Sequence, residues 1–444
     1  RLYDQPQVRP VVAEGRSFVR RSQDKFDVIQ ATFVDTWAAT AAGAFALAEN
    51  YIYTVEAFED YLSHLTPTGI ITMTRWVHVP GMEFVRLAAV ARRALERMGV
   101  KEPYQHTFAA YSGALGTLLV KRSPFTKDEL LMLQRECDER GYSVFYSPDQ
   151  RRNNPVQHVL GPEDPALFFQ KFPVDVRPVF DERPFFFYSV KPERVFHELM
   201  KGSKGGALNS FSLQILAGLT VMVAILLFAS IMVPLWWKKR HQLVGETGSK
   251  IRDLLFFVCL GVGFIVVELG LLQRFSLHLG HPTYSLQVVL FSVLFFSGVG
   301  SLVSGKTKTE RGLTLQLGSS AAGTAVLITI YIIALRPLLY IAIAWSLVWR
   351  ILLCMGLVAM PAFLMGMLVP TGVRLVSLRH KEIIPWCWGL NGAASVFGAV
   401  LTMVFALHFG ISATLGVGAL AYIFALFMGL RRLGGCCREV SDLN

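Results

Sequence analysis

The sequence is poor in cysteine and in charged residues. It has six cysteines, and their spacing matches no common zinc or iron–sulfur motif, so we expect no metal. Charged residues make up 17% of the 444 residues, which is low for a water-soluble protein. No basic segment is interleaved with aromatic residues, so nucleic acid is not an expected partner.

Apolar residues, by contrast, make up 53% of the chain. Crossing a bilayer takes about 20 of them in a row. Seven such spans are expected, at 211–237, 253–273, 284–304, 313–335, 350–370, 385–408 and 411–430. The run Leu338–Trp349 is expected to be interfacial or re-entrant, and Pro361 and Pro370 are expected to interrupt the fifth span. The sequence therefore predicts an all-α domain at 211–430 with the lipid bilayer as partner, followed by a polar tail at 431–444.

Lysine and arginine are distributed unequally between the loops. Most lie in the first, third and fifth loops and in the tail, which the positive-inside rule assigns to the cytoplasm. With seven spans, the amino-terminal domain would then lie outside. Basic residues also flank the first span, among them Lys191 and Arg194, so the side of this domain stays open.

Several polar residues lie within or beside the apolar spans. Charge inside hydrocarbon is costly, so an intramembrane ionisable residue is a candidate functional residue by default. Alternatively, Glu268 is a structural clamp held by Arg274 or Arg374. The intramembrane candidates are Glu268, Gln273, Arg274, His281, Arg374 and Asn391.

Residues 1–125 alternate between short apolar runs and amphipathic patterns, which predicts a parallel α/β sheet. Strands are expected at Val8–Ala13, Phe26–Thr32 and Ile70–Trp76, and Thr107–Tyr111 with Leu115–Lys121 is expected to form a final strand pair around Ser112-Gly113. Helices are expected at Arg16–Arg21, Thr54–Leu65 and Met82–Met98, with a break at Thr66–Gly69.

Residues 126–210 are expected to be an extension of this domain and a connector. They contain a predicted helix, Thr126–Arg140, and a predicted short strand, Tyr142–Phe145. The aromatic run Phe185–Tyr188 suits either a membrane interface, a docking seam against the helical bundle, or a buried strand edge.

Two soluble segments, FDVIQATFVDTW and TVEAFEDYLSHLTPTGIITMTRW, resemble the second half of the spermidine synthase domain. That domain is a Rossmann-like sheet of the S-adenosylmethionine methyltransferase class. The motifs GVGFIVVELGLLQRFSLHLGHPTYSLQVVLFSVLFFSGVGSLVSG, FLMGMLVPTGVRL and PWCWGLNGAASVFGAV resemble the membrane half of fused, membrane-bound spermidine synthase-like proteins. The resemblance implies a partial Rossmann-like domain, its amino-terminal part lying before residue 1, on a helical bundle in a bacterial inner (plasma) membrane.

The resemblance also implies roles for individual residues. Glu14-Gly15 stands where the family has a pair that contacts the adenine of decarboxylated S-adenosylmethionine or S-adenosylmethionine. Asp35 matches the family's acid that holds the amine substrate. Thr32 stands where the family has the Asp that acts as general base on the attacking amine. A threonine hydroxyl has no useful basicity near neutral pH. Taken alone, Asp35 is alternatively a loop acid or helix cap, and Glu14 a solvated acid before a turn.

Three functions remain open at this point. The first is a membrane-bound transferase that moves an aminopropyl or methyl group to an amine or membrane substrate. The second is a transporter with a regulatory α/β domain, although the two halves of the bundle show no inverted repeat. The third is a catalytically inactive scaffold, which Thr32 favours. The sequence indicates no oligomeric state.

Overall fold

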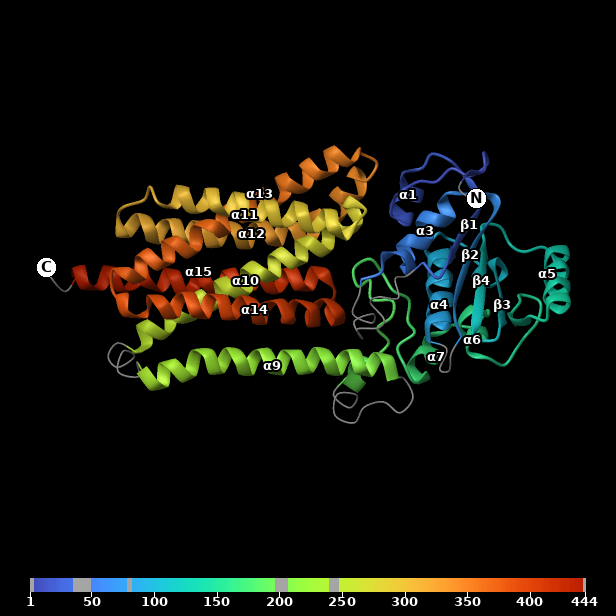
Figure 1. The fold of residues 1–444 in the computed structure, drawn as a ribbon, viewed down its shortest axis with the longest axis horizontal. Coiled ribbons are helices and arrows are strands. Elements are labelled where there is room, and N and C mark those ends of the chain that lie inside the picture. Colours follow the sequence, from blue (N-terminus) through green and yellow to red (C-terminus); the bar gives the residue numbers. More distant parts are fainter. Residues whose placement is uncertain (1–3, 35–48, 78–81, 196–206, 239–246, 442–444) are drawn as a thin grey trace. The chain divides into compact units, whose positions relative to one another are not determined.

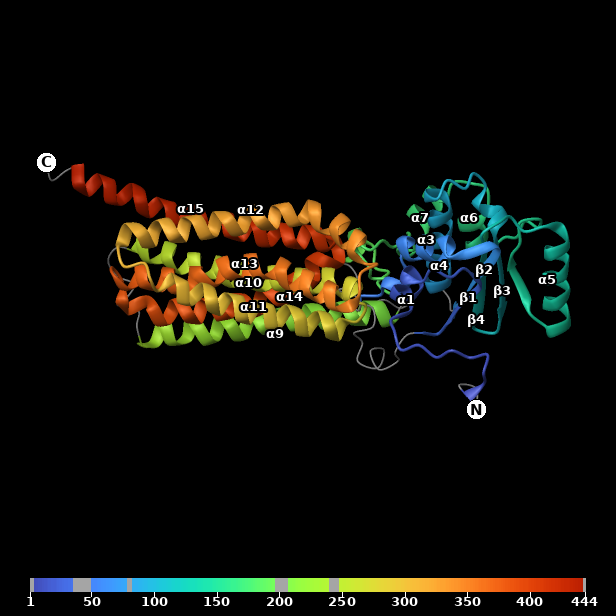
Figure 2. The same ribbon diagram turned by 90° about the horizontal axis from the view of Figure 1, so that it is seen from above.

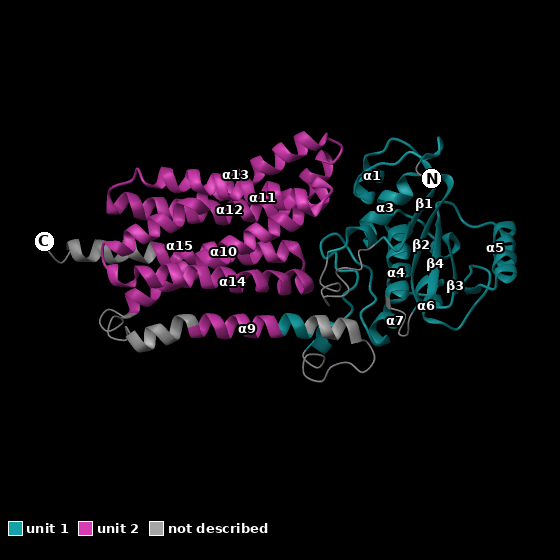
Figure 3. Ribbon diagram, in the orientation of Figure 1, with its two compact units in different colours: residues 1–217 teal, residues 218–444 magenta. Residues whose placement is uncertain are grey.

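The computed structural model describes residues 4–34, 49–77, 82–195, 207–238 and 247–441. The chain divides into two compact units, residues 1–217 and 218–444 (Figure 3). The first unit is a mixed α/β domain, and the second is a set of long apolar helices.

The first unit is built on a five-stranded sheet with the order β1-β2-β4-β3-β5. Its strands are β1 (Phe26–Thr32), β2 (Leu65–Trp76), β3 (Thr107–Ser112), β4 (Leu115–Lys121) and β5 (Ser143–Tyr146). Only β1 and β2 pair in parallel, whereas β4 pairs antiparallel with β2 and β3, and β5 pairs antiparallel with β3. The expected parallel sheet is therefore confirmed only for β1 and β2 and is wrong for the other strands, whereas the expected pairing of Thr107–Tyr111 with Leu115–Lys121 is confirmed. The link from β3 to β4 turns at Gly113, with φ 55°, and is too short for a parallel crossover.

The parallel pair is joined through helix α3 (Val55–Ser63). The Thr54 side chain accepts a hydrogen bond from the amide of Ala57 at 3.2 Å, which confirms the expected start of this helix. The expected break at Thr66–Gly69 lies within β2 and forms an irregularity in its pairing with β1. A Cβ atom at Gly69 would lie 2.8 Å from the carbonyl oxygen of Phe26, so only glycine fits this close approach.

The expected strand Val8–Ala13 does not form. Most of these residues are exposed and carry no strand pairing, and Pro10 has no amide hydrogen to give a neighbouring strand. Helix α1 (Gly15–Arg21) follows, as expected. β1 is consequently an edge strand of the described sheet, and its Val28 side chain is 59% exposed.

Helices cover the two faces of the sheet unequally (Figures 1 and 2). Helices α3 and α4 (Met82–Arg97) lie on one face, and α5 (Lys127–Arg140) lies on the other. A capping box between Thr126 and Glu129 starts α5. Two short helices, α6 (Pro155–Leu160) and α7 (Ala166–Lys171), follow β5.

The run Phe185–Tyr188 is buried and forms no strand. The rings of Phe186 and Phe187 pack on Tyr53, with centroid distances of 4.7 and 6.1 Å. The side chain of Arg86, on α4, donates to the carbonyl oxygens of Phe186 at 2.5 Å and Tyr188 at 2.6 Å. The expected membrane interface or bundle seam is thus wrong for Phe186 and Phe187, because both belong to the core of the α/β domain.

The second unit consists of long helices, which run side by side in Figures 1 and 2. They are α9 (Ala207–Lys238), α10 (Thr247–Leu279), α11 (Pro282–Ser304), α12 (Glu310–Ala342), α13 (Leu347–Ser377), α14 (Ile384–Phe409) and α15 (Ile411–Ser441). Within the described residues, six helices are long and apolar enough to cross a membrane, and they match the second to seventh expected spans. The described apolar part of α9, Gln214–Ala229, is shorter than a span, so the first span stays a prediction.

Leu338–Trp349 is no separate re-entrant segment, because α12 continues through Pro337 to Ala342 and α13 begins at Leu347. Its expected interfacial position stays a prediction. The expected interruption of the fifth span is wrong, because helix α13 continues through Pro361 and Pro370. Pro361 cannot bond the carbonyl of Leu357, one turn earlier, but the hydroxyl of Tyr331 on α12 donates to that carbonyl at 2.6 Å.

Close backbone approach holds the bundle together at small residues. A Cβ atom at Gly300 would overlap the carbonyl oxygen of Phe363, so α11 and α13 meet at their backbones. A Cβ at Gly261 on α10 would overlap the carbonyl oxygen of Asn391 on α14 in the same way. Small residues thus let α11 pack closely on α13, and α10 on α14.

Candidate functional site

The carboxyl ends of β1 and β2 meet at one edge of the sheet, because the two strands are parallel. Thr32 ends β1 opposite Thr74 of β2, and the Thr74 hydroxyl lies 2.9 Å from that of Thr117 on β4. A row of three threonines thus crosses three strands on one face of the sheet. Ligands of open α/β sheets bind outside such carboxyl ends, which makes this edge the candidate site of the first unit.

An aromatic pair borders the threonine row. The ring centroids of Phe33, directly after β1, and Trp76, the last residue of β2, lie 5.1 Å apart. Phe33 has φ 48°, a left-handed conformation that is uncommon for a bulky residue and costs about 1–2 kcal/mol. This turn places the Phe33 ring against Trp76. Both side chains are partly exposed and present flat apolar surface at the edge.

On the opposite face of the sheet, the same edge is covered by buried side chains. Arg75, next to Trp76 in β2, is buried with its guanidinium carbon 4.1 Å from the ring centroid of Tyr53 and 5.4 Å from that of Phe187. A guanidinium over aromatic faces is a cation–π arrangement. Arg75 therefore fixes the aromatic wall behind the strands.

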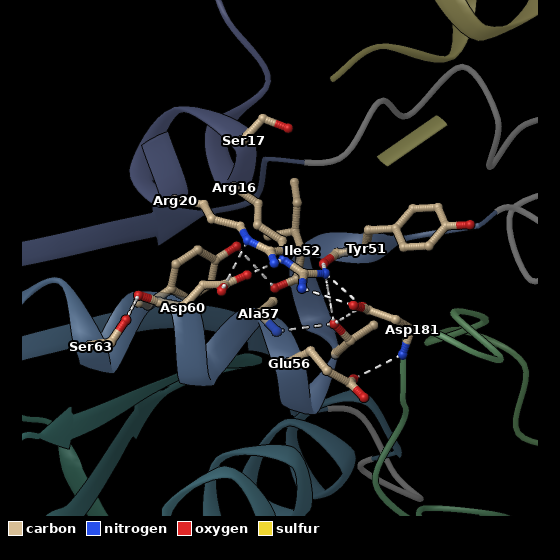
Figure 4. Close-up of polar contacts among 12 residues, drawn as sticks. Arg16, Ser17, Arg20, Tyr51, Ile52, Glu56, Ala57, Asp60, Ser63 and Asp181 are labelled. Atoms are coloured by element: carbon tan, nitrogen blue, oxygen red, sulfur yellow. Dashed lines mark hydrogen bonds and ion pairs between the residues drawn. The ribbon is translucent and has the colours of Figure 1, made fainter. Parts of the chain in front are cut away.

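A buried arginine lies between α1, α3 and the connector. Figure 4 shows Arg16 between Asp60 and Asp181, with the ring of Tyr51 pointing away. Arg16 Nε lies 2.8 Å from Asp60 Oδ2, and its Nη1 and Nη2 lie 2.6 and 2.9 Å from the two carboxylate oxygens of Asp181. Arg16 Nη1 also donates to the carbonyl oxygen of Tyr51 at 3.0 Å and to the hydroxyl of Thr54 at 3.1 Å.

Burial alone would lower the pKa of Arg16, but the carboxylates of Asp181 and Asp60 raise it well above its ordinary value. The group is therefore permanently charged and held from two sides. This arrangement fits a structural clamp that ties α1 and the connector to the start of α3. It does not fit an anion-binding arginine, whose donors would face a ligand.

The structure gives Glu14 a capping role. Its two carboxylate oxygens accept hydrogen bonds from the amides of Arg16 at 3.0 Å and Ser17 at 2.7 Å, at the start of α1. Gly15, the first residue of that helix, is exposed. Asp35 lies outside the described residues.

The intramembrane candidates do not form one cluster. Most bond to nearby backbone: Asn391 Nδ2 donates to the carbonyl of Phe257 at 3.1 Å, and Arg374 Nη1 to that of Ser304 at 2.9 Å. His281 Nδ1 accepts from the amide of Thr283 at 3.1 Å and caps α11. Gln273 is buried in α10. These contacts satisfy polar groups that a bilayer cannot hydrate.

The expected clamp on Glu268 is wrong. Arg274 donates to the hydroxyl of Ser412 at 2.6 Å, and Arg374 binds carbonyls after α11. Glu268 and Arg274 are six residues apart on α10, which puts them on different sides of the helix. Neither arginine contacts the Glu268 carboxylate, which has no hydrogen-bond or ion-pair partner among the described residues.

Sequence reasoning missed the two best-connected residues of the first unit, Arg16 and Arg86. One signal for Arg16 was present: Val19 lies three residues later in α1, so helical spacing puts Arg16 on the apolar face of that helix. The bidentate partner of Arg16, Asp181, lies 165 residues away in the sequence, which no local pattern reveals.

No protein-family model, curated protein or solved structure matches this chain. Within the described residues, no group of three or more His, Cys, Asp or Glu side chains is placed to hold a metal ion.

Proposed function

We propose that the chain is an integral membrane, spermidine synthase-like protein that transfers an aminopropyl or methyl group. The donor is decarboxylated S-adenosylmethionine or S-adenosylmethionine, and the acceptor is an amine or a membrane substrate. The observation that carries the proposal is the β1–α3–β2 unit, whose carboxyl edge bears the Phe33–Trp76 pair beside a row of threonines. The resemblance of residues 26–76 to the spermidine synthase domain supports the same edge.

Each part of the edge suits a part of the donor. The flat surface of Trp76 suits the adenine ring, because aromatic rings favour offset stacking. The hydroxyls of Thr32 and Thr74 both donate and accept hydrogen bonds and suit the ribose. Glu14 keeps its proposed contact with the adenine, since each carboxylate oxygen that caps α1 has a second lone pair.

The acceptor is assigned to Asp35. An amine that attacks the carbon next to a sulfonium forms a carbon–nitrogen bond, releases the thioether and loses one proton. Thr32 cannot take that proton near neutral pH. Asp35 is the acid that the motif retains after β1, so it orients the amine and receives the proton.

Calorimetric titration of the purified full chain tests the proposal. Decarboxylated S-adenosylmethionine, S-adenosylmethionine and methylthioadenosine are titrated separately into the protein, into Trp76→Ala and into Leu167→Ala. Leu167 is an exposed apolar residue on α7 of the same domain, outside the threonine row and the Phe33–Trp76 pair, and serves as the matched control. We expect micromolar binding that Trp76→Ala abolishes and Leu167→Ala retains.

A turnover assay with Asp35→Asn separates binding from chemistry. The variant should bind the nucleoside as the wild type does and lose transfer to an amine acceptor. If the unaltered chain binds none of the three nucleosides, the transferase proposal is wrong and the inactive scaffold becomes the better account.

A further inference from the structure

Glu268, on α10, is a buried acidic residue without a partner among the described residues. It is the only acidic residue between Asp253 and Glu310 in the sequence, and its side chain is buried, with 7% of the residue exposed. No described residue gives its carboxylate a hydrogen bond or an ion pair. An ionised carboxylate in an apolar interior without a counter-charge is strongly disfavoured, so it requires a cation.

A second unsatisfied polar group lies on α11. Ser292 is fully buried, and its hydroxyl oxygen has no hydrogen-bond partner among the described residues. The hydroxyl of Ser285, seven residues earlier, donates to the carbonyl of Leu272 on α10 at 2.6 Å. Seven residues are close to two helical turns, so Ser292 lies on the same, α10-facing side of α11.

The Ser285–Leu272 contact also sets the relative depth of the two groups. Glu268 lies four residues before Leu272, and Ser292 lies seven residues after Ser285. Because α10 and α11 are consecutive antiparallel helices, both positions lie on the same side of this contact, separated by about 4.5 Å along the helix axes. Glu268 lies seven residues after Gly261, whose side of α10 meets Asn391 of α14, so α14 borders this position as well.

Several other ionisable groups on α10 and on the helices packed against it have partners elsewhere, and Arg252, Asp253 and His278 lie at least ten residues from Glu268 along α10. The contacts of the partnered groups are Lys250 with Glu382, Arg274 with Ser412, His281 with the amide of Thr283, Arg350 with the carbonyl of His278, Arg374 with the carbonyls of Ser304 and Thr307, His380 with Ser249, and His408 with the carbonyl of Val404. Asn391 and Ser395 of α14 bond to the carbonyls of Phe257 and Gly261 on α10. None of these contacts reaches Glu268.

We propose that Glu268 and Ser292 form a binding site for one monovalent cation, a proton or Na⁺, between α10 and α11. The Glu268 carboxylate supplies the negative charge. The Ser292 hydroxyl supplies a neutral oxygen ligand to Na⁺, or donates to the carboxylate while the proton is absent. This site is independent of the proposed transferase, which uses the carboxyl edge of the sheet in the other unit.

Labelling with dicyclohexylcarbodiimide tests the site, because this apolar reagent modifies protonated carboxyl groups in apolar surroundings. The full chain in detergent is labelled between pH 5.5 and 9, with 100 mM NaCl or 100 mM choline chloride as roughly matched salts, and modified peptides are identified by mass spectrometry. Glu268→Gln removes the target, and Glu310 and Glu382, which are paired with Arg379 and Lys250 at helix ends, serve as internal controls.

We expect Glu268 to be labelled at low pH and labelling to disappear as pH rises. Faster loss in NaCl than in choline chloride would identify Na⁺, whereas equal loss would identify the proton. Ser292→Ala should raise the midpoint of the pH dependence in choline chloride by about one pH unit, because the carboxylate loses a hydrogen-bond donor.

Two results would overturn the inference. One is labelling of Glu268 that changes with neither pH nor Na⁺, which would make the group a permanently protonated structural element. The other is a complete lack of reaction at every pH in protein that elutes as a folded monodisperse species. An unchanged midpoint in Ser292→Ala would remove Ser292 from the site.

Discussion

Arg86 anchors the connector to α4, and we predict that Arg86→Met loosens residues 174–190. Its guanidinium donates to three buried carbonyl oxygens, those of Asp175, Phe186 and Tyr188. Methionine preserves much of the side chain's volume but donates no hydrogen bond. The three carbonyls would remain buried without their present donor, which distinguishes this change from the replacement of a whole ion pair by apolar residues.

The size of the effect follows from two opposing contributions. Three hydrogen bonds from a charged donor contribute about 1.5–3 kcal/mol each. Against this, burial lowers the pKa of Arg86 to about 10 even though Asp175 acts to raise it, so removing the charge recovers about 3 kcal/mol. The net loss is therefore about 1.5–6 kcal/mol, or roughly 10- to 25,000-fold faster opening.

Hydrogen exchange of the full chain, read by mass spectrometry on peptides from 174–190, measures this opening. Arg93→Met is the matched control, because Arg93 lies on the same helix, is half exposed and pairs with Glu96 at 3.1 Å on the surface. The control should change exchange by less than about 0.5 kcal/mol. Equal exchange in Arg86→Met and Arg93→Met would refute the anchoring role of Arg86.

Two further predictions concern acid sensitivity and bundle packing. Burial acts to raise the pKa of Asp175, but hydrogen bonds from Arg177 and the charge of Arg86 outweigh it and lower the pKa to about 2. The ionised carboxylate thus contributes about 2 kcal/mol to the free energy of unfolding at neutral pH, and this contribution is lost as the pH falls from 4 towards 2. Hydrogen exchange in 174–190 should therefore accelerate over this pH range, and Asp175→Asn should abolish the pH dependence. Separately, Gly300→Ala should cost about 1–3 kcal/mol and lower the thermal midpoint in detergent, whereas Gly298→Ala, with open space around it, should not.

Strands and helices with strong local signals could be predicted from the sequence. Phe26–Thr32 and the helix starting after Thr54 were found because a buried apolar run and a capping threonine are local features. Val8–Ala13 looked like a strand for the same reason, but a strand also needs a partner with free hydrogen-bonding groups, which no local pattern reveals. The pair around Ser112-Gly113 was found because its turn is local, but the antiparallel placement of β4 beside β2 depends on contacts between distant segments and was missed.

The role of Phe185–Tyr188 could not be decided from its own residues. An aromatic run has the same composition at a membrane interface and in a protein core. What decides between them is Arg86, about 100 positions earlier in the chain, on a helix that carries several other arginines. The candidate edge at Trp76 was easier to anticipate, because two parallel strands bring their carboxyl ends together wherever they occur.

Buried charge separates structural from functional residues in this chain. Arg16 and Arg86 are buried but meet carboxylates or carbonyl oxygens at hydrogen-bond distance, and Arg374 in the bundle meets carbonyls in the same way. Each of these arginines supplies hydrogen-bond donors to acceptors that would otherwise be left without one. Glu268 does not follow this pattern within the described helices, since burying its carboxylate satisfies no neighbour. A buried carboxylate that no protein group pairs with is explained by a ligand that pairs with it, and the ligand of a carboxylate is a cation.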